Sequence, residues 1–304
     1  MPANDHIIEY DLPHANSRPQ DITAGPGGYL WFCQFGGNRI GRISPGDGTI
    51  AEFNLPRPNS GPRVMAVGPD GDIWFTQNLG NRIGRIDQNG IVREFDIPTR
   101  NSEPRGIKTG ADGNLWFAES AANRIGRITP TGAITEFRLP QPNSNPRSVA
   151  PGPDGNIWFV EGLGNRIGRI TPAGEITEFD LPAPNSAPAD ITAGPDGKMW
   201  FTELAGNRIG RISMDGEIEE FRLPKPYSQP VLIKLGPDNN LWFCQFRGNR
   251  IGRITPEGKI AEYAIPTEDS QPRGIAAGPD RNIWFSEQRG NRIGRILLTP
   301  THSQ

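Results

Sequence analysis

Short runs of alternating apolar and polar residues, each closed by Gly, Pro, Asp or Asn, follow one another along the whole chain. In one copy of the pattern the runs cover residues 186–193, 199–203, 207–212 and 217–223. None has the 3.6-residue period of an amphipathic helix, and alternation between turn residues is typical of β-strands. Pro-Asp-Gly between the first two runs predicts a tight turn, because Pro presets φ and Gly accepts a positive φ. We therefore expect four short strands per copy.

The unit of four strands occurs seven times. Each copy contains Trp-Phe followed by GNRIGRI or a close variant, and the tryptophans are Trp31, Trp74, Trp116, Trp158, Trp200, Trp242 and Trp284. Repeats of this length indicate solenoids, propellers or arrays, and four antiparallel strands per repeat are typical of a propeller blade. The sequence predicts an all-β protein, a seven-bladed β-propeller of four-stranded antiparallel blades, as a single domain over residues 1–304.

The two ends of the pattern predict how the ring closes. Residues 6–13 (HIIEYDLP) match the fourth strand of the unit (EITEFDLP, residues 175–182), whereas the last copy ends after its third strand and leaves a tail at 299–304. We expect residues 6–13 to complete the last blade, which removes a sheet edge that could pair with another chain.

Residues that recur in every copy are interpreted as structural. One arginine column comprises Arg39, Arg82, Arg124, Arg166, Arg208, Arg250 and Arg292. A second comprises Arg42, Arg85, Arg127, Arg169, Arg211, Arg253 and Arg295. A glutamate column on the fourth strand comprises Glu9, Glu52, Glu94, Glu136, Glu178, Glu220 and Glu262. We predict cross-strand Arg–Glu pairs worth ~0.2–1 kcal/mol each, a Trp and Ile core between blades, and turns at Asn38 and its equivalents.

Composition narrows the function. The net charge is −2, which favours neither nucleic acid nor a membrane surface as partner. No apolar run approaches the roughly 20 residues of a membrane-spanning helix, and the first residues lack the features of a signal peptide, so we expect a cytoplasmic monomer or an already processed chain. Cys33 and Cys244 stand in blades one and six. Because blade seven separates them, we expect free, buried thiols rather than a disulfide.

Candidate ligand-binding residues lie where the copies differ. Connections from the second to the third strand, and from the fourth strand to the next blade, should open on one face. The residue after the first-strand proline reads Gln20, Arg63, Arg105, Arg147, Ala189, Val231 and Arg273. The third residue after Trp reads Gln34, Gln77, Glu119, Glu161, Glu203, Gln245 and Glu287. The fourth reads Phe35, Asn78, Ser120, Gly162, Leu204, Phe246 and Gln288. An uneven polar mouth of this kind predicts a ligand site; a solvated rim of Arg–Glu pairs is the alternative.

Motifs of common catalytic sites are absent from the sequence. The chain has no G-x-S-x-G, P-loop, C-x-x-C or H-E-x-x-H. Its three histidines, His6, His14 and His302, neither repeat nor pair at ligand spacing.

The units GPDGNIWFVE, GNRIGRITP and GEITEFDLPAPNSAP resemble the virginiamycin B lyase (streptogramin lyase) family over residues 6–298. The resemblance implies a seven-bladed propeller that opens cyclic depsipeptides of the streptogramin B type at their ester, by elimination and with Mg²⁺. It also implies a general-base His after the first-strand Pro of the last blade and a second His after that of the preceding blade. Two Glu metal ligands would stand just before the last-blade Pro and at the end of its second strand.

This chain departs from the family pattern at all four positions, which hold Arg273, Val231, Gln271 and Gln288 respectively. A guanidinium cannot accept a proton near neutrality, and neutral amides are poor ligands for a hard cation. Blade three matches part of the family pattern, with Glu103 before Pro and Glu119 at the end of the second strand. These two glutamates are the remaining candidate metal ligands. Arg105 nevertheless stands where the base would be.

Three functions stay open at this point. The first is binding of a small anionic or peptidic ligand, or a protein, at the mouth by Arg63, Arg105, Arg147, Arg273 and Gln288. The second is a divergent Mg²⁺-dependent carbon–oxygen lyase. The third is a structural or protein-interaction ring. A six-bladed lactone hydrolase is disfavoured by the blade count.

Overall fold

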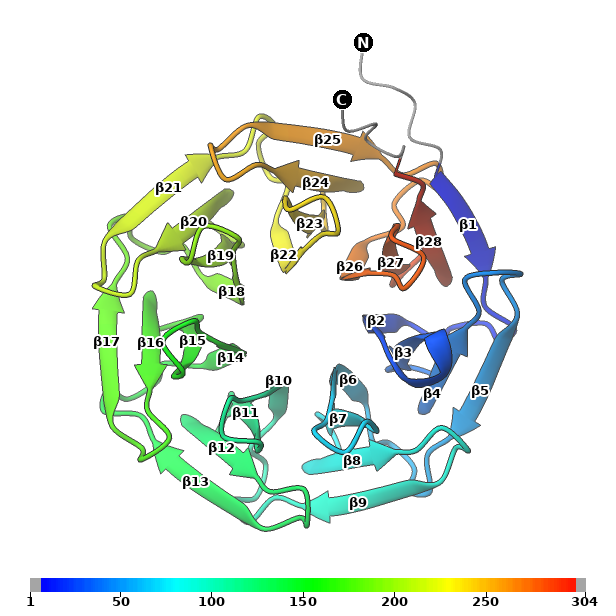
Figure 1. Ribbon diagram of the computed structural model, residues 1–304, viewed down its shortest axis with the longest axis horizontal. Helices are drawn as coiled ribbons and strands as arrows, with labels where there is room; N and C mark the ends of the chain where they lie inside the picture. Colours follow the sequence, from blue (N-terminus) through cyan, green and yellow to red (C-terminus); the bar gives the residue numbers. More distant parts are fainter. Residues whose placement is uncertain (1–6, 299–304) are drawn as a thin grey trace.

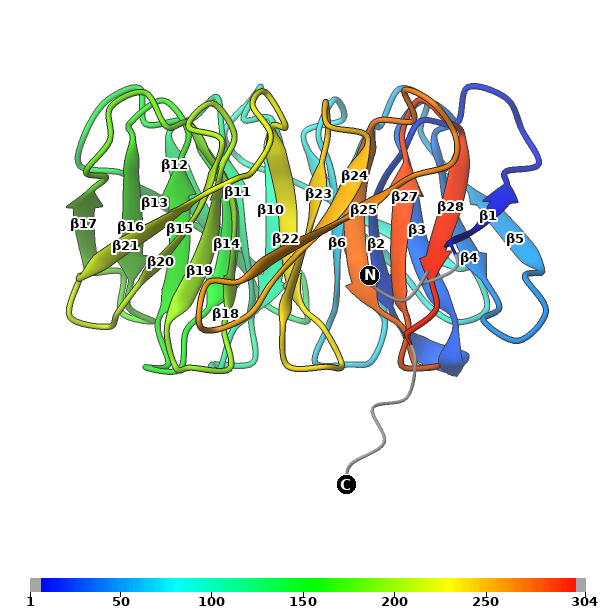
Figure 2. The same cartoon turned by 90° about the horizontal axis from the view of Figure 1, so that it is seen from above.

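The computed structural model describes residues 7–298, and these form a closed ring of seven four-stranded antiparallel sheets (Figure 1). The first strand of each blade lies nearest the centre and the fourth lies on the rim (Figure 1). Seen from the side, the ring is a thick disc with loops on two faces (Figure 2). The predicted fold class is confirmed.

Every blade follows the same order from the centre outward. Blade 1 comprises β2 (Pro19–Ala24), β3 (Leu30–Gln34), β4 (Arg39–Ile43) and β5 (Ile50–Asn54), with a 3₁₀ turn at Pro26–Gly28. Blade 2 comprises β6 (Pro62–Val67), β7 (Ile73–Gln77), β8 (Arg82–Ile86) and β9 (Val92–Asp96). Blade 3 comprises β10 (Pro104–Thr109), β11 (Leu115–Glu119), β12 (Arg124–Ile128) and β13 (Ile134–Arg138). Blade 4 comprises β14 (Pro146–Pro151), β15 (Ile157–Glu161), β16 (Arg166–Ile170) and β17 (Ile176–Asp180).

The remaining blades repeat this order. Blade 5 comprises β18 (Pro188–Ala193), β19 (Met199–Glu203), β20 (Arg208–Ile212) and β21 (Ile218–Arg222). Blade 6 comprises β22 (Pro230–Leu235), β23 (Leu241–Gln245), β24 (Arg250–Ile254) and β25 (Ile260–Ala264). Blade 7 comprises β26 (Pro272–Ala277), β27 (Ile283–Glu287), β28 (Arg292–Ile296) and β1 (Ile7–Asp11). Among residues 7–298 no helix is long and apolar enough to cross a bilayer.

The ring closes as predicted, through β1. This strand pairs antiparallel with β28, with Ile7 opposite Ile296 and Asp11 opposite Arg292 (Figure 1). The Tyr10 ring stacks on Trp284 at 5.6 Å between centroids, as each fourth-strand aromatic does on its own blade's Trp. The predicted first residue of this segment, His6, and the tail at 299–304 with His302 lie outside the described residues.

The tryptophan column is the core between blades, as predicted. All seven indoles are fully buried, and Trp31 packs in one cluster with Met65 and Phe75 of the next blade. The glycine of the RIGRI run serves this packing, because the Phe32 ring lies flat on Gly41 and a Cβ there would come within 2.2 Å of it. Cys33 and Cys244 are buried and unpaired, which confirms the free thiols.

The two arginine columns have different partners. Five arginines of the first column lie within 4.0 Å of a fourth-strand glutamate, in the pairs Arg82–Glu94, Arg124–Glu136, Arg166–Glu178, Arg208–Glu220 and Arg292–Glu9. The second column does not pair with the glutamate column, which corrects the prediction for it. Its guanidinium groups lie over the Trp rings, 5.3 Å from the centroid for Arg127 on Trp116. Five of them pair with the Asp of the preceding turn, as Arg211 does with Asp196 at 3.1 Å.

Removing residues 1–13 should lower the melting temperature by about 10 °C or more, because it exposes the β28 edge and deletes the Tyr10–Trp284 stack. Thermal unfolding followed by near-UV circular dichroism measures the effect, and removal of residues 1–6 alone is the control. An unchanged melt after the longer deletion would contradict the role of β1 in closure.

Candidate functional site

Loops of two kinds meet on one face of the ring, which confirms the predicted placement of these loops. In blade 1 the β3–β4 loop bonds to the loop that enters β2, through Phe35 N to Arg18 O at 3.2 Å and Gly36 N to Ser17 O at 3.0 Å. Equivalent backbone bonds occur in the other blades, for example Leu204 N to Ala187 O at 3.2 Å.

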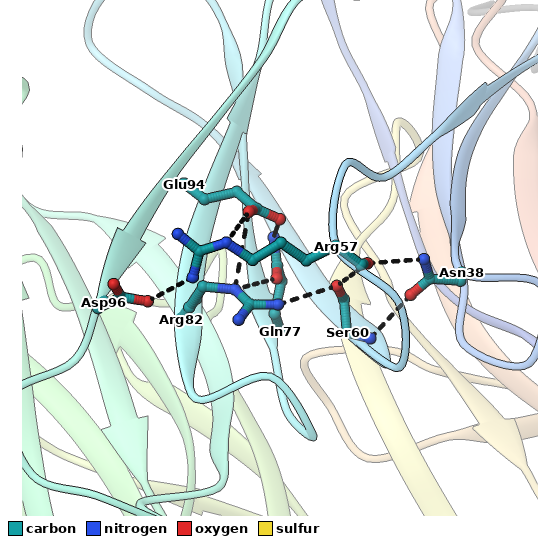
Figure 3. Close-up of polar contacts among 7 residues, drawn as sticks. All are labelled: Asn38, Arg57, Ser60, Gln77, Arg82, Glu94 and Asp96. Atoms are coloured by element: carbon teal, nitrogen blue, oxygen red, sulfur yellow. Dashed lines mark hydrogen bonds and ion pairs between the residues drawn. The ribbon is translucent and has the colours of Figure 1, made fainter.

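A polar network common to the blades holds this face in place (Figure 3). The Asn38 side chain accepts from Ser60 N at 2.8 Å and donates to Arg57 O at 3.0 Å, so blade 1 fixes the loop that leads into blade 2. Arg82 donates to Ser60 Oγ at 3.2 Å and to Gln77 Oε1 at 2.9 Å. Asn38 has a φ of 53°, the left-handed turn conformation that Asn tolerates, and its six equivalents share a positive φ. The predicted turn role is confirmed.

Four of the predicted mouth arginines converge on one cavity of about 200 Å³ at the end of the central channel. We name it the arginine cavity, and its charged lining residues are Arg63, Arg105, Arg147, Arg273, Lys108, Lys234, Asp21 and Asp190. Val231 and Leu232 supply an apolar wall. Val231 is buried, so it takes part as an apolar contact only. The arginines come from blades 2, 3, 4 and 7, which explains why no local motif joins them.

The guanidinium groups of this cavity are poorly neutralised. Burial lowers the pKa of Arg63 well below its usual value, and neighbouring Arg273, Arg105 and Arg147 lower it further, against the opposing charge of Glu103. Burial, followed by Arg105, lowers the pKa of Arg273 to about 10. The Nε of Arg105 is buried without a hydrogen-bond partner. These groups remain protonated near neutrality, so the cavity concentrates positive charge.

Two of the arginines are positioned by neutral side chains. Arg147 Nε donates to Asn145 Oδ1 at 3.0 Å. Arg273 Nη1 donates to Gln288 Oε1 at 3.3 Å, and its guanidinium carbon lies 5.8 Å from the Phe246 ring centroid. Asn145 and Gln288 are neutral, so these hydrogen bonds orient the two guanidinium groups without neutralising their charge. An oriented guanidinium group can bind an anion through charge-assisted hydrogen bonds.

Deeper in the channel the structure reveals charged residues that sequence reasoning missed. Lys234 Nζ lies 2.9 Å from Asp190 Oδ2, which also accepts from Ile233 N at 2.8 Å, while Ser148 Oγ donates to Asp190 Oδ1 at 2.5 Å. Asp21 accepts from Ile22 N at 3.0 Å and Met65 N at 3.1 Å. The sequence does contain an indication of these residues. The second and fourth residues after the first-strand Pro also differ between copies, and within this strand Asp and Lys occur only at these two positions.

The third residue after Trp does not belong to the mouth, which corrects the prediction. All seven members of this column are fully buried inside their blades. In three blades the residue is Gln and donates to the fourth-strand Glu, as Gln77 Nε2 does to Glu94 at 2.8 Å. In four blades it is Glu, so two carboxyl groups meet.

In two of these four blades, 3 and 7, the surroundings of the buried glutamate favour its protonated form, whereas in blades 4 and 5 the buried glutamate pairs with Arg166 or Arg208. Burial, followed by the neighbouring Glu136, raises the pKa of Glu119 to about 8. Burial and then Glu9 raise the pKa of Glu287 to about 8. A protonated carboxyl can donate to its neighbour as the amide does in the other blades. Near neutrality Glu119 is therefore a protonated side chain that contacts Glu136 and has a structural role.

The remaining candidates lie outside the arginine cavity. Gln271 and Gln288 line a neighbouring hollow of about 360 Å³, together with Asn16, Arg18, Arg289 and Asn291; we name it the glutamine cavity. The second strand of blade 7, β27, ends at Glu287, the equivalent of Glu119, and not at Gln288, which corrects the assignment of that metal-ligand position to Gln288. Glu103 is exposed, whereas Glu119 is buried. The two candidate metal ligands therefore lie in different environments. Within residues 7–298 no group of three or more His, Cys, Asp or Glu side chains is placed to hold a metal ion.

A closed ring of seven four-stranded antiparallel blades defines a seven-bladed β-propeller. Comparison with known proteins specifies the family. The model of the virginiamycin B lyase family matches residues 1–162 and 141–301. A streptogramin B lyase structure superposes with a TM-score of 0.93 at 39% identity, over 97% of this chain and 98% of that one. No curated protein matches the chain.

Virginiamycin B lyase from Staphylococcus aureus is similarly close, with a TM-score of 0.92 and 41% identity over 97% of this chain and 99% of that one. A catalytically inactive His-to-Ala variant of the same enzyme, solved with quinupristin, gives the same values. This chain belongs to the virginiamycin B lyase family.

Replacing Glu119 with Gln should stabilise the protein by about 1 kcal/mol at pH 8, because the amide donates to Glu136 without needing a proton. Below about pH 4.3 the carboxyl is protonated in both folded and unfolded chains. Between there and pH 8 only the unfolded chain releases the proton, so the wild type loses stability as pH rises. The gain should therefore vanish near pH 4 in urea unfolding curves. The reverse change, Gln77→Glu, is the control and should destabilise at pH 8; a gain that is independent of pH would contradict the shared proton.

Proposed function

We propose that this protein binds a small anionic or peptidic ligand, or an acidic segment of a protein, in the arginine cavity, and that it does not carry out the elimination typical of its family. The observation that carries the proposal is the gathering of Arg63, Arg105, Arg147 and Arg273 around one cavity. None of the four has an ion-pair partner within 4.0 Å among residues 7–298, unlike the arginines of the first structural column.

Charge and geometry both favour an anion. Four arginines, two lysines and only two carboxylates line the arginine cavity, while the whole chain carries a net charge of −2. A cleft of one sign with low-dielectric walls focuses its field and raises the local concentration of the oppositely charged ligand. Guanidinium groups bind carboxylate and phosphate through two parallel hydrogen bonds. The volume of about 200 Å³ equals that of about seven water molecules, so the part of the ligand that enters is small.

The residues at three of the family's lyase positions, Arg273, Val231 and Gln271, support the second half of the proposal. Arg273 stays protonated near neutrality and has no lone pair with which to remove a proton. Gln271 and Gln288 line the glutamine cavity beside Arg18 and Arg289, and two cations with neutral amides do not fit a divalent metal. A divergent Mg²⁺-dependent lyase would have to use Glu103 and Glu119, and the second of these is a buried, protonated partner of Glu136.

Replacing Arg105 with Ala should weaken binding of pyrophosphate at least tenfold, because it removes a charge-assisted contact of about 1.5–3 kcal/mol. Isothermal titration calorimetry at low and high salt measures the loss. Arg127→Ala is the matched control, since that guanidinium lies on Trp116 and should affect the melting temperature rather than binding. Similar behaviour of the two variants in both assays would remove the distinction between site and scaffold.

The unmodified protein should open a streptogramin B at least ~10²-fold more slowly than the lyases, because a missing general base typically costs ~10²–10⁴-fold. Missing stabilisation of the developing negative charge adds to that loss. Chromatography of quinupristin incubated with protein and Mg²⁺ measures ring opening. The combined variant Val231→His, Gln271→Glu, Arg273→His, Gln288→Glu is the comparison. Efficient opening by the unmodified protein would refute the loss of lyase chemistry.

A further inference from the structure

We propose that Lys108 is a carbonyl-reactive amine at the floor of the arginine cavity, and that the cavity accepts a small anionic aldehyde or 2-oxo acid as an imine on this side chain. The inference rests on the proposed function, since the arginines would hold the anionic group of the same ligand. It adds a covalent step that neither the fold nor the family assigns.

Lys108 has the required position. It lines the arginine cavity and also a second cavity of about 280 Å³ further along the channel, so its side chain stands where the two meet. It lies deep in the ring yet keeps part of its surface open. Its Nζ donates to Met65 O at 3.2 Å, and no carboxylate within residues 7–298 lies at ion-pair distance from it. The amine is therefore reachable from the cavity and lacks a salt-bridge partner.

Lys234 is the natural contrast. It occupies the same place in its copy of the repeat as Lys108 does, and it lines the same two cavities. Its Nζ, however, is paired with Asp190 at 2.9 Å. A paired ammonium keeps its proton and is a poor nucleophile, whereas an unpaired amine among cations loses it more readily.

The arrangement of the blades explains the difference. Asp190 and Lys234 stand in adjacent blades, 5 and 6, and meet directly. Asp21 stands in blade 1, at the position that Asp190 occupies in blade 5. In the next blade, blade 2, the position equivalent to Lys234 is occupied by Ala66, so Asp21 has no lysine in the adjacent blade. Lys108 is one blade further, in blade 3, while the two Asp21 oxygens accept from backbone amides.

The electrostatic surroundings support a neutral amine. Burial, and then the charge of Lys234, lower the pKa of Lys108, against the opposing effects of Asp21 and Asp190. The pKa of Lys234 is raised despite its burial, chiefly by Asp190. A lysine that is desolvated beside other cations is the known pattern for an amine that forms Schiff bases.

The step is chemically balanced without an added oxidant or reductant. The neutral Nζ lone pair attacks the carbonyl carbon, and the carbonyl oxygen takes one proton from the attacking nitrogen to give a carbinolamine. The carbinolamine then loses its hydroxyl group together with the second N–H proton as water, and the nitrogen lone pair forms the C=N bond. One water molecule leaves for each imine. The carboxylate or phosphate of the ligand stays with the guanidinium groups of Arg105 and Arg147, which line the same cavity as Lys108.

Reductive trapping tests the proposal. The unmodified protein is incubated with glyoxylate at pH 7, reduced with sodium borohydride, digested and mapped by mass spectrometry. We expect a carboxymethyl group on Lys108, formed at least tenfold faster than on Lys234 or on the other lysines. Pyrophosphate should suppress it, and a neutral aldehyde of similar size should label Lys108 more slowly. Lys108→Arg should abolish this product, whereas Lys234→Arg should retain it, with thermal melts confirming that both variants fold.

The outcomes separate the two proposals. Labelling spread evenly over all lysines, or confined to Lys234, overturns the role of Lys108. Tight pyrophosphate binding by calorimetry with no label on Lys108 overturns the imine but leaves the anion site standing. No pyrophosphate binding together with no label overturns the proposed function as well. Because the mapping uses the unmodified protein, the result does not depend on a variant that fails to fold.

Discussion

Each blade depends on its neighbour to bury its tryptophan. The indole packs beneath its own fourth-strand aromatic and arginine and against the second strand of the next blade, as Trp31 does with Phe53, Arg42 and Phe75. A sheet that buries its core only against another copy is stable only in a stack, and a closed ring leaves no terminal copy without a neighbour. This constraint explains why the Trp, Gly and Arg columns recur, and why β1 must complete blade 7.

The same constraint limits where the chain can vary. Blade faces are occupied by the core and rims by paired charges, so differences between copies accumulate on the strand that lines the channel. There the side chains of seven blades face one another across a narrow space, and a charge in one blade can act on another that is far away in sequence. The Asp190–Lys234 pair and the isolated Lys108 are products of this geometry rather than of any local motif.

The period of the sequence was sufficient to predict the blade count, the closing strand, the free thiols and the arginines of the mouth. The sequence period did not predict which side chains face the channel where the alternation of the first strand is interrupted. In six blades the register of the first strand shifts between its Pro and the third residue after it, as between Pro104 and Ile107, and in blade 4 it shifts between Pro146 and Ser148. This irregularity changes which side chains face the channel, so Asp21 and Lys108 were overlooked. The third residue after Trp, such as Glu119, was predicted at the mouth but is buried inside the blade. The last residue of a strand can point into the loop region or into the sheet interior, and the sequence pattern is the same in both cases.

The two kinds of arginine in this ring show how a scaffold becomes a site. Arg124 lies 3.3 Å from Glu136 in its own blade, so its charge is balanced within the fold. Arg63 has no such partner and lies among three other guanidinium groups. Desolvation and mutual repulsion make that cluster unfavourable, and the folding free energy of the rest of the ring must offset it. Under the proposed function, an anion bound in the cavity would reduce the repulsion among the arginines, and this relief would contribute to the affinity for the ligand.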